Sequence, residues 1–193
     1  MPEVEAQTQT KIETSKRKTE YDLEVVVPHR KLVLAGSLLA KAMPPVAVLS
    51  PEDVEEMARK MKRTSRTVLA ALRYSGLVLL LRKDGKKHWI YLKGMDVDTM
   101  KRVLSKKAKS LNPWAKKVLE YSQEEIHRMA EEKGVSVRKL LANLKEDYLV
   151  IRLKYPREIK YVIFKGVKLS EALKALEEFT RVLNGQPPEE VKN

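Results

Sequence analysis

Basic side chains recur in two segments of this chain that lie 72 residues apart. Arginine can donate two hydrogen bonds to guanine, asparagine can do the same with adenine, and lysine neutralises phosphate charge. The two segments could therefore hold a nucleic acid. The candidate contact residues are Lys62, Arg63, Arg66, Thr67, Arg73, Arg82, Lys83, Lys86 and Lys87 in the first segment and Arg138, Lys139, Asn143, Lys145 and Arg157 in the second.

The distribution of charge supports this chemistry. The net charge is +13, with 39 Lys and Arg against 26 Asp and Glu. Residues 50–94 carry 11 basic and 5 acidic side chains, whereas residues 122–166 carry 10 and 7. Such a surplus is typical of proteins that bind polyanions. A charged, thermophile-like surface is the alternative explanation, and the low Asn and Gln content also fits it.

These segments belong to a 45-residue repeat, because residues 50–94 align with residues 122–166 without a gap. Apolar positions such as Leu72 and Leu144 stay in register throughout. A repeat of this kind indicates a duplicated structural unit. We expect two small cores, with residues 21–108 and 109–183 as the two units and tails at 1–20 and 184–193.

Helix signals open each unit. Ser50 and Ser122 are candidate N-caps, and each is followed three residues later by an acidic residue, which predicts a capping box. A second short helix is predicted over 65–75 and again over 137–147. Further helices are predicted over 30–43 and 113–121, and after candidate N-caps at Asp98 and Ser170.

Strand patterns close each unit. Two apolar runs flank Asp84 and Gly85, a pair that suits a type I′ hairpin turn. The second unit has the corresponding runs at 149–154 and 159–165, and an additional strand is predicted from Tyr21 to Val27. The expected fold class is α+β and rich in helix.

The order helix, tight turn, helix, β-hairpin resembles the winged-helix family of helix-turn-helix DNA-binding proteins, in an archaeal-like form. Residues Ala130 to Ser136 are similar to the helix-turn-helix signature: an alanine, three residues, then Gly-Val-Ser. The resemblance implies two tandem winged-helix units whose second helices enter the major groove. The first unit has Lys62 in place of the glycine, so we expect it to supply charge and the second unit the better-formed turn.

Aromatic residues of the hairpins leave a further alternative open. Trp89, Tyr91, Tyr161 and Phe164 could stack on the bases of a single strand. The apolar run from Leu77 to Leu81 favours core packing instead, because a sheet that is apolar on both faces must be covered on both. Lysines and arginine between the units could add contacts, namely Lys101, Arg102, Lys106, Lys107 and Lys109.

Several classes of function find no support in the sequence. The chain has no cysteine, and His29, His88 and His127 lack metal-ligand spacing. We expect no enzyme activity, no cofactor, no metal and no membrane association, and a cytoplasmic, nucleoid-associated location.

The leading prediction is therefore a double-stranded DNA-binding protein that regulates transcription or acts on chromatin. One alternative is a winged-helix adaptor that binds proteins of the transcription or replication machinery. The other is a protein that binds single-stranded nucleic acid.

Overall fold

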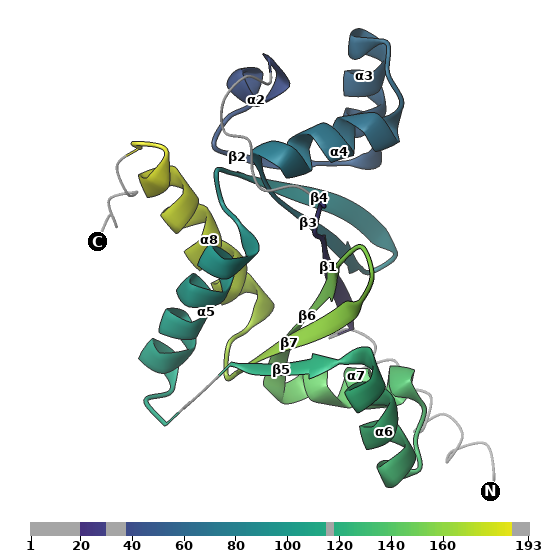
Figure 1. Cartoon of the computed structure of the whole chain (residues 1–193). Coiled ribbons are helices and arrows are strands. Elements are labelled where there is room, and N and C mark those ends of the chain that lie inside the picture. Colours follow the sequence, from purple (N-terminus) through teal and green to yellow (C-terminus); the bar gives the residue numbers. More distant parts are fainter. Residues whose placement is uncertain (1–19, 30–37, 115–117, 187–193) are drawn as a thin grey trace, which may run out of the picture.

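The computed structural model describes residues 20–29, 38–114 and 118–186. These residues form seven helices and one mixed sheet of seven strands, so the expected α+β class is confirmed (Figure 1). The described part of the predicted 30–43 helix is α2 (Leu38–Ala42), and residues 30–37 lie outside the described ranges.

The repeat corresponds to one order of elements that occurs twice. The first unit consists of β2 (Val46–Leu49), α3 (Pro51–Met61), α4 (Ser65–Ser75), β3 (Gly76–Lys83), β4 (Lys86–Lys93) and α5 (Val97–Leu111). The second consists of β5 (Leu119–Ser122), α6 (Gln123–Lys133), α7 (Val137–Asp147), β6 (Tyr148–Lys154), β7 (Ile159–Lys165) and α8 (Leu169–Leu183). Strand β1 (Tyr21–Val26) precedes both units.

The predicted N-caps at Ser50 and Ser122 are confirmed. The Ser50 hydroxyl accepts a hydrogen bond from the Asp53 N–H, and the Asp53 carboxylate accepts one from the Ser50 N–H, which closes a capping box. Ser122 accepts from the Glu125 N–H. Among the described residues, Glu125 makes no bond back to Ser122, so the second predicted capping box is wrong.

Three other predictions of helix starts are also wrong. Residues 119–122 form β5 rather than the end of a helix from Pro113, because they pair with β7 from elsewhere in the chain. Helix α5 begins at Val97 with Asp96 as its N-cap, and α8 begins at Leu169 after Lys168. Asp98 and Ser170 are therefore not N-caps but lie within the first turns of these helices.

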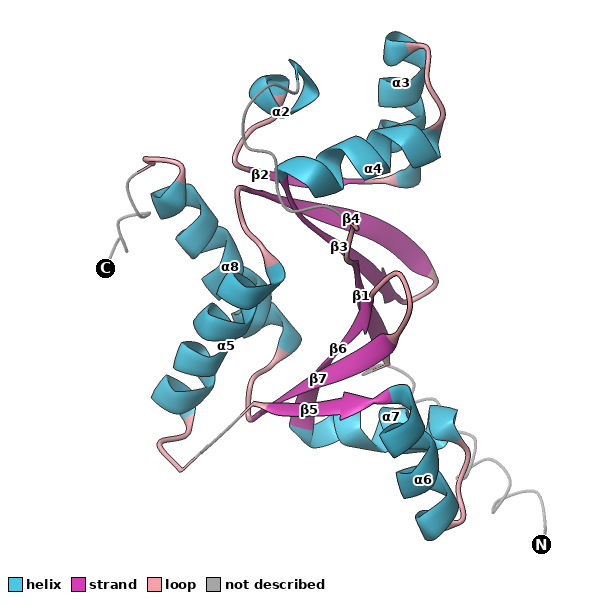
Figure 2. Cartoon of the chain, in the orientation of Figure 1, coloured by secondary structure: helices cyan, strands magenta, loops and turns pink. Residues whose placement is uncertain are grey.

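The sheet has the order β2-β4-β3-β1-β6-β7-β5, so both units contribute to it and β1 lies between them (Figure 2). Strand β1 runs antiparallel to β3 and parallel to β6. Glu24 in β1 faces Leu80 on one side and Arg152 on the other. Leu80 and Arg152 are 72 residues apart, which is the offset of the repeat. An approximate twofold axis through the sheet at Glu24 therefore relates the two units.

Helices cover both faces of the sheet. On one face, α5 and α8 pack against a cluster that contains Leu23 and Leu79 as well as Ile151 and Phe164. On the other face, α3 and α4 cover the first unit and α6 and α7 cover the second, each pair over its own smaller cluster. The largest cluster is shared by the two units, so the prediction of two separate cores is wrong. Burial on both faces explains why the run from Leu77 to Leu80 is entirely apolar.

Candidate nucleic-acid interface

The two helix pairs lie on the same face of the sheet, toward its two ends (Figure 1). In each pair a residue in the left-handed conformation turns the chain between the helices: Lys62 with φ 54° and Gly134 with φ 65°. Thr64 and Ser136 then cap the second helices by accepting from the N–H groups of Thr67 and Lys139. The local sequence thus sets the same turn twice, although only one unit has the glycine that favours it.

Most of the predicted helix contacts are exposed. In the first unit, Lys62 and Arg63 lie in the turn, and Arg66 and Thr67 lie in the first turn of α4. In the second, Arg138, Lys139 and Asn143 are exposed along α7. Among the described residues, the basic members of this set form no ion pair, so their charges remain available to a ligand.

Arg73 and Lys145 do not point outward, and their prediction as free contacts is wrong. Both are partly buried, and both lie near β1, since Lys145 pairs with Asp22 and Arg73 lines a pocket with the end of that strand. Lys145 Nζ lies 2.9 Å from a carboxylate oxygen of Asp22, and its side chain is only 14% exposed. Arg73 Nε is buried and has no hydrogen-bond partner among the described residues. The Lys145 ammonium is therefore engaged by Asp22, whereas Arg73 has only its Nε atom buried without a partner.

The hairpin of the first unit ends in a tight turn with four exposed cations. Asp84 and Gly85 both have positive φ angles, as a type I′ turn requires, which confirms the prediction from this pair. The cations are Arg82, Lys83, Lys86 and Lys87, and Lys87 Nζ lies 4.7 Å from the centre of the Trp89 ring.

The hairpin of the second unit carries less free charge. Arg157 is exposed at its turn. Lys160 Nζ lies 3.6 Å from a carboxylate oxygen of Glu158 and 5.8 Å from the Tyr155 ring centre. Arg152 is bonded to Glu24 and is only partly exposed. The stronger positive surface is therefore the hairpin of the first unit.

This hairpin lies next to the second helix of the other unit, an arrangement that sequence reasoning did not foresee. A cleft of about 300 Å³ has Arg82, Lys83, Asp84 and Gly85 on one side and residues of α7 on the other. The α7 residues are Arg138, Ala142 and Lys145, and the start of β1 forms the floor. Arg82 and Lys83 of the first unit and Arg138 of the second therefore border one cleft, together with the carboxylates of Glu20, Asp22 and Asp84.

The hairpin aromatic residues are part of the core. Trp89 is 7% exposed and Tyr91 is fully buried, with its hydroxyl 2.7 Å from Ser75 Oγ. Burial raises the pKa of Tyr91, and the Ser75 hydrogen bond opposes this effect. Tyr161 and Phe164 are buried as well. The core-packing interpretation is confirmed, and the alternative of a stacking platform on these strands is wrong.

One exposed aromatic residue was missed. Trp114 is 84% exposed after the end of α5, where its N–H donates to Asn112 Oδ1. The sequence shows only an Asn-Pro-Trp triplet there, which predicts a helix start. The basic residues of α5 lie across the sheet from the helix pairs, and Lys101 pairs with Glu120 at 3.2 Å (Figure 1). They do not extend the surface described above.

In the described ranges, no group of three or more acidic or histidine side chains is arranged to hold a metal ion. None of the described helices is long and apolar enough to cross a membrane. Comparisons with protein-family models, curated proteins and solved structures gave no significant match.

Proposed function

We propose that this chain binds double-stranded DNA through two winged-helix units, as a transcriptional regulator or a chromatin-associated factor. The order of elements supports this proposal: each unit has a strand, two helices joined by a tight turn, and a hairpin whose second strand pairs with the first strand of the unit. In this proposal α4 and α7 are the recognition helices and the hairpins are the wings.

The observation that carries the proposal is that basic side chains of both units border the same cleft. The β3–β4 hairpin of one unit and α7 of the other border the same cleft, with Arg82 and Arg138 on its two sides. A duplex that contacts α7 would meet this hairpin at the same time. We propose that Lys83, Lys86 and Lys87 neutralise phosphates, whereas Arg138 and Asn143 read base edges.

The first unit would contribute through Arg66 and Thr67 on α4. Because α4 and α7 lie toward opposite ends of the sheet on one face, the two helices could contact successive parts of one duplex, as the two subunits of a dimer do (Figure 1). Arg73 and Lys145 have no part in this contact.

A salt titration of binding tests the proposal. With roughly 6 to 10 phosphate contacts, affinity for duplex DNA should fall by about 10³ to 10⁵ between 50 and 200 mM salt. Single-stranded DNA and RNA of the same sequence are the comparison ligands. Undetectable or salt-insensitive binding to duplex would contradict the proposal.

Two kinds of variant separate the roles of the residues. Replacing Lys86 and Lys87 with Gln should weaken binding to all sequences alike and reduce the salt dependence. Arg138→Ala and Arg66→Ala should also relax sequence preference. The matched control replaces Lys106 and Lys109 with Gln, because these exposed lysines lie on α5 across the sheet. Equal effects in control and test variants would show that only net charge matters.

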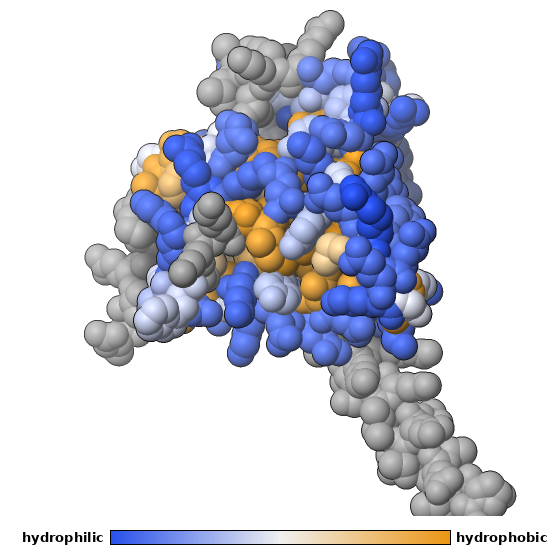
Figure 3. All heavy atoms as spheres, turned by 60° about the horizontal axis from the view of Figure 1, so that its bottom comes forward, coloured by the Kyte–Doolittle hydropathy of each residue, from blue (hydrophilic) through white to orange (hydrophobic). Residues whose placement is uncertain are grey.

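A protein-binding adaptor is the second candidate, and one surface feature favours it. Figure 3 shows an apolar area surrounded by hydrophilic side chains at the lower end of the molecule. Leu111 at the end of α5 and Leu119 at the start of β5 are exposed apolar side chains at this end. Replacing both with Ser should leave DNA binding intact and abolish capture of a protein partner if this candidate is correct.

A further inference from the structure

Strand β1 separates from a neighbouring strand at each of its two ends. Its pairing with β6 begins at Glu24 and Arg152, so the residues of β1 before Glu24 have no strand partner on that side. Its pairing with β3 ends at Val25 and Leu79. The approximate twofold axis at Glu24 exchanges the two ends of β1, so the sheet contains two equivalent gaps.

A tyrosine of the chain itself fills the gap beside β6. The Tyr21 hydroxyl accepts a hydrogen bond from the Val150 N–H at 3.1 Å and donates one to the Tyr148 carbonyl at 3.5 Å. The ring is buried, and Lys145 Nζ lies 5.6 Å from its centre. One phenol group thus satisfies a backbone donor and a backbone acceptor of β6 that β1 leaves without strand partners.

The gap beside β3 contains a backbone donor and acceptor that have no partner. The backbone bond between Ser75 and Gly94 continues the ladder of β3 with β4. Because bonded residues alternate along a strand, Gly76 and Val78 direct their backbone groups toward β1. Pairing with β1 ends before it reaches them, and Pro28, which would lie opposite Gly76, has no N–H to donate. Among the described residues, the Val78 N–H and the Gly76 carbonyl therefore make no hydrogen bond.

These two groups are the counterparts of the Val150 N–H and the Tyr148 carbonyl, which lie 72 residues later in the repeat. The axis at Glu24 places Val27 where Tyr21 lies in the other gap, and valine has no hydroxyl to offer. Buried backbone groups without partners are unfavourable, and a bound molecule can supply what is missing.

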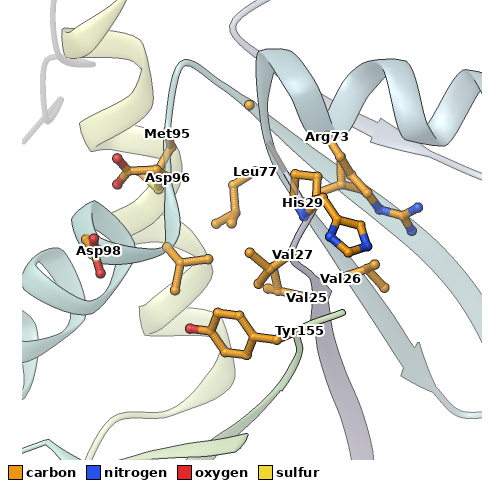
Figure 4. A pocket seen from close by; sticks show the side chains of 14 residues that line it. Val25, Val26, Val27, His29, Arg73, Leu77, Met95, Asp96, Asp98 and Tyr155 are labelled. Carbon is orange, nitrogen blue, oxygen red and sulfur yellow. The ribbon is translucent and has the colours of Figure 1, made fainter. Parts of the chain in front are cut away.

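A cavity of about 550 Å³ lies in this gap, lined by residues 25–29 and 76–78 together with the start of α5. Val27 packs toward the face that α5 and α8 cover, whereas Val78 belongs to the cluster on the other face. Figure 4 likewise shows Val26 on the opposite side of β1 from Val27. Side chains of both faces line the cavity because it lies between two strands of the sheet.

We propose that this cavity binds a neutral phenol, whose ring lies between β1 and β3 and whose hydroxyl accepts from the Val78 N–H and donates to the Gly76 carbonyl. Tyr21 makes the same two contacts in the equivalent gap. The mainly apolar lining suits an aromatic ring. Asp96 and Asp98 are exposed members of the lining, and their charges disfavour an anionic ligand. The site does not depend on the proposed function.

Titration of the full chain with p-cresol, followed by the NMR chemical shifts of backbone amides, tests the site. A saturable shift is expected at the Val78 amide. Toluene has the same ring without the hydroxyl, and cyclohexanol has a hydroxyl on a ring that is not planar. Both should bind at least about tenfold more weakly than p-cresol, a factor that corresponds to one hydrogen bond. Absence of a saturable shift at Val78, or equal affinity for either comparison ligand, would overturn the proposal.

Two substitutions at Val27 test the role of the hydroxyl. Val27→Tyr places a phenol in this gap, as Tyr21 does in the other, and should abolish saturable binding of p-cresol. Val27→Phe is the matched control, because it adds the ring without the hydroxyl. Hydrogen exchange of the Val78 amide should be at least about tenfold slower in Val27→Tyr than in Val27→Phe, since only tyrosine supplies an acceptor. Equal exchange rates, or undiminished p-cresol binding in Val27→Tyr, would overturn the proposal.

Tyr21→Phe leaves the cavity unchanged and removes the hydroxyl from the occupied gap alone. Exchange of the Val150 amide should become faster in this variant, whereas the affinity for p-cresol measured at Val78 should equal that of the parent. A loss of affinity at Val78 in Tyr21→Phe would contradict the assignment of p-cresol to the gap beside β3.

Discussion

At residue scale, positions 62 and 134 show how the two units build the same turn from different side chains. Lys62 and Gly134 each follow the first helix of a pair and have left-handed backbone angles, with φ 54° and 65°. A side chain with a Cβ adopts this conformation at a cost of roughly 1 kcal/mol, whereas glycine adopts it freely. We expect Lys62→Gly to raise the free energy of unfolding by about 1 kcal/mol, as measured by urea denaturation.

The reciprocal change is the control for this prediction. A Cβ at Gly134 would meet no atom within 4 Å, so Gly134→Lys introduces backbone strain without a steric clash. It should lower the free energy of unfolding by a similar amount, about 1 kcal/mol. If both substitutions changed stability in the same direction, the strain argument would fail.

Asp53 provides a pH-dependent contribution to stability. Hydrogen bonds from the Ser50 backbone and side chain lower the pKa of Asp53 below its ordinary value of 3.8. The charged form is therefore favoured in the folded state, so its contribution is present above the unfolded pKa and is lost as the pH falls through the lowered one. Asp53→Ala should be less stable than the parent at neutral pH, and the difference should shrink as the pH falls below 3.8 and disappear once the pH has passed the lowered pKa.

The corresponding residue of the second unit tests this prediction independently. The Glu125 side chain makes no bond back to Ser122 among the described residues. Glu125→Ala should therefore produce a smaller loss of stability than Asp53→Ala, measured by denaturation over the same pH series. A pH profile common to both variants would point to a general charge effect rather than to the capping box.

At the scale of elements, β1 connects the two units. Tyr21, Leu23 and Val25 alternate into the shared core, while Asp22 and Glu24 on the other face bind Lys145 and Arg152.

Leu23 is 3% exposed, so Leu23→Ala should lower the free energy of unfolding by about 2 to 5 kcal/mol. Because β1 pairs with both units, circular dichroism and tryptophan fluorescence should follow one shifted transition. Separate transitions for the two probes would show that the units unfold independently.

Elements defined by local sequence could be predicted. The second helices of both units span 65–75 and 137–147, as the apolar period and the caps indicate. The hairpin at Asp84 and Gly85 could be predicted for the same reason, since its turn depends on two adjacent residues.

Elements that depend on distant pairing could not be predicted. Residues 119–122 are a strand only because β7 lies beside them, and nothing local opposes a helix there. The orientation of Arg73 and Lys145 depends on β1, a strand that lies more than 40 residues away in sequence. The position of the first hairpin beside α7 likewise follows from the order of strands in the sheet, which the repeat alone does not determine.

At the scale of the whole molecule, the two units are parts of one body rather than two independent modules. One sheet contains strands of both units, and its largest core cluster combines α5 of the first unit with α8 of the second. The proposed DNA surface is also built from both units, because Arg82 of the first unit and Arg138 of the second border its central cleft. We therefore expect the two units to unfold together and to contribute jointly to DNA binding.

A double-mutant cycle on DNA binding tests this coupling. Because Arg82 and Arg138 border one cleft, they would hold the same stretch of duplex, and loss of either should loosen the contact of the other. The double variant Arg82→Ala and Arg138→Ala should therefore lose less affinity than the sum of the single variants, by at least about 0.5 kcal/mol. Arg66 and Arg138 lie on helices toward opposite ends of the sheet, so that pair should be additive (Figure 1). Dissociation constants measured at one fixed salt concentration give both values. Additivity in the Arg82 and Arg138 pair would show that each unit contacts DNA by itself.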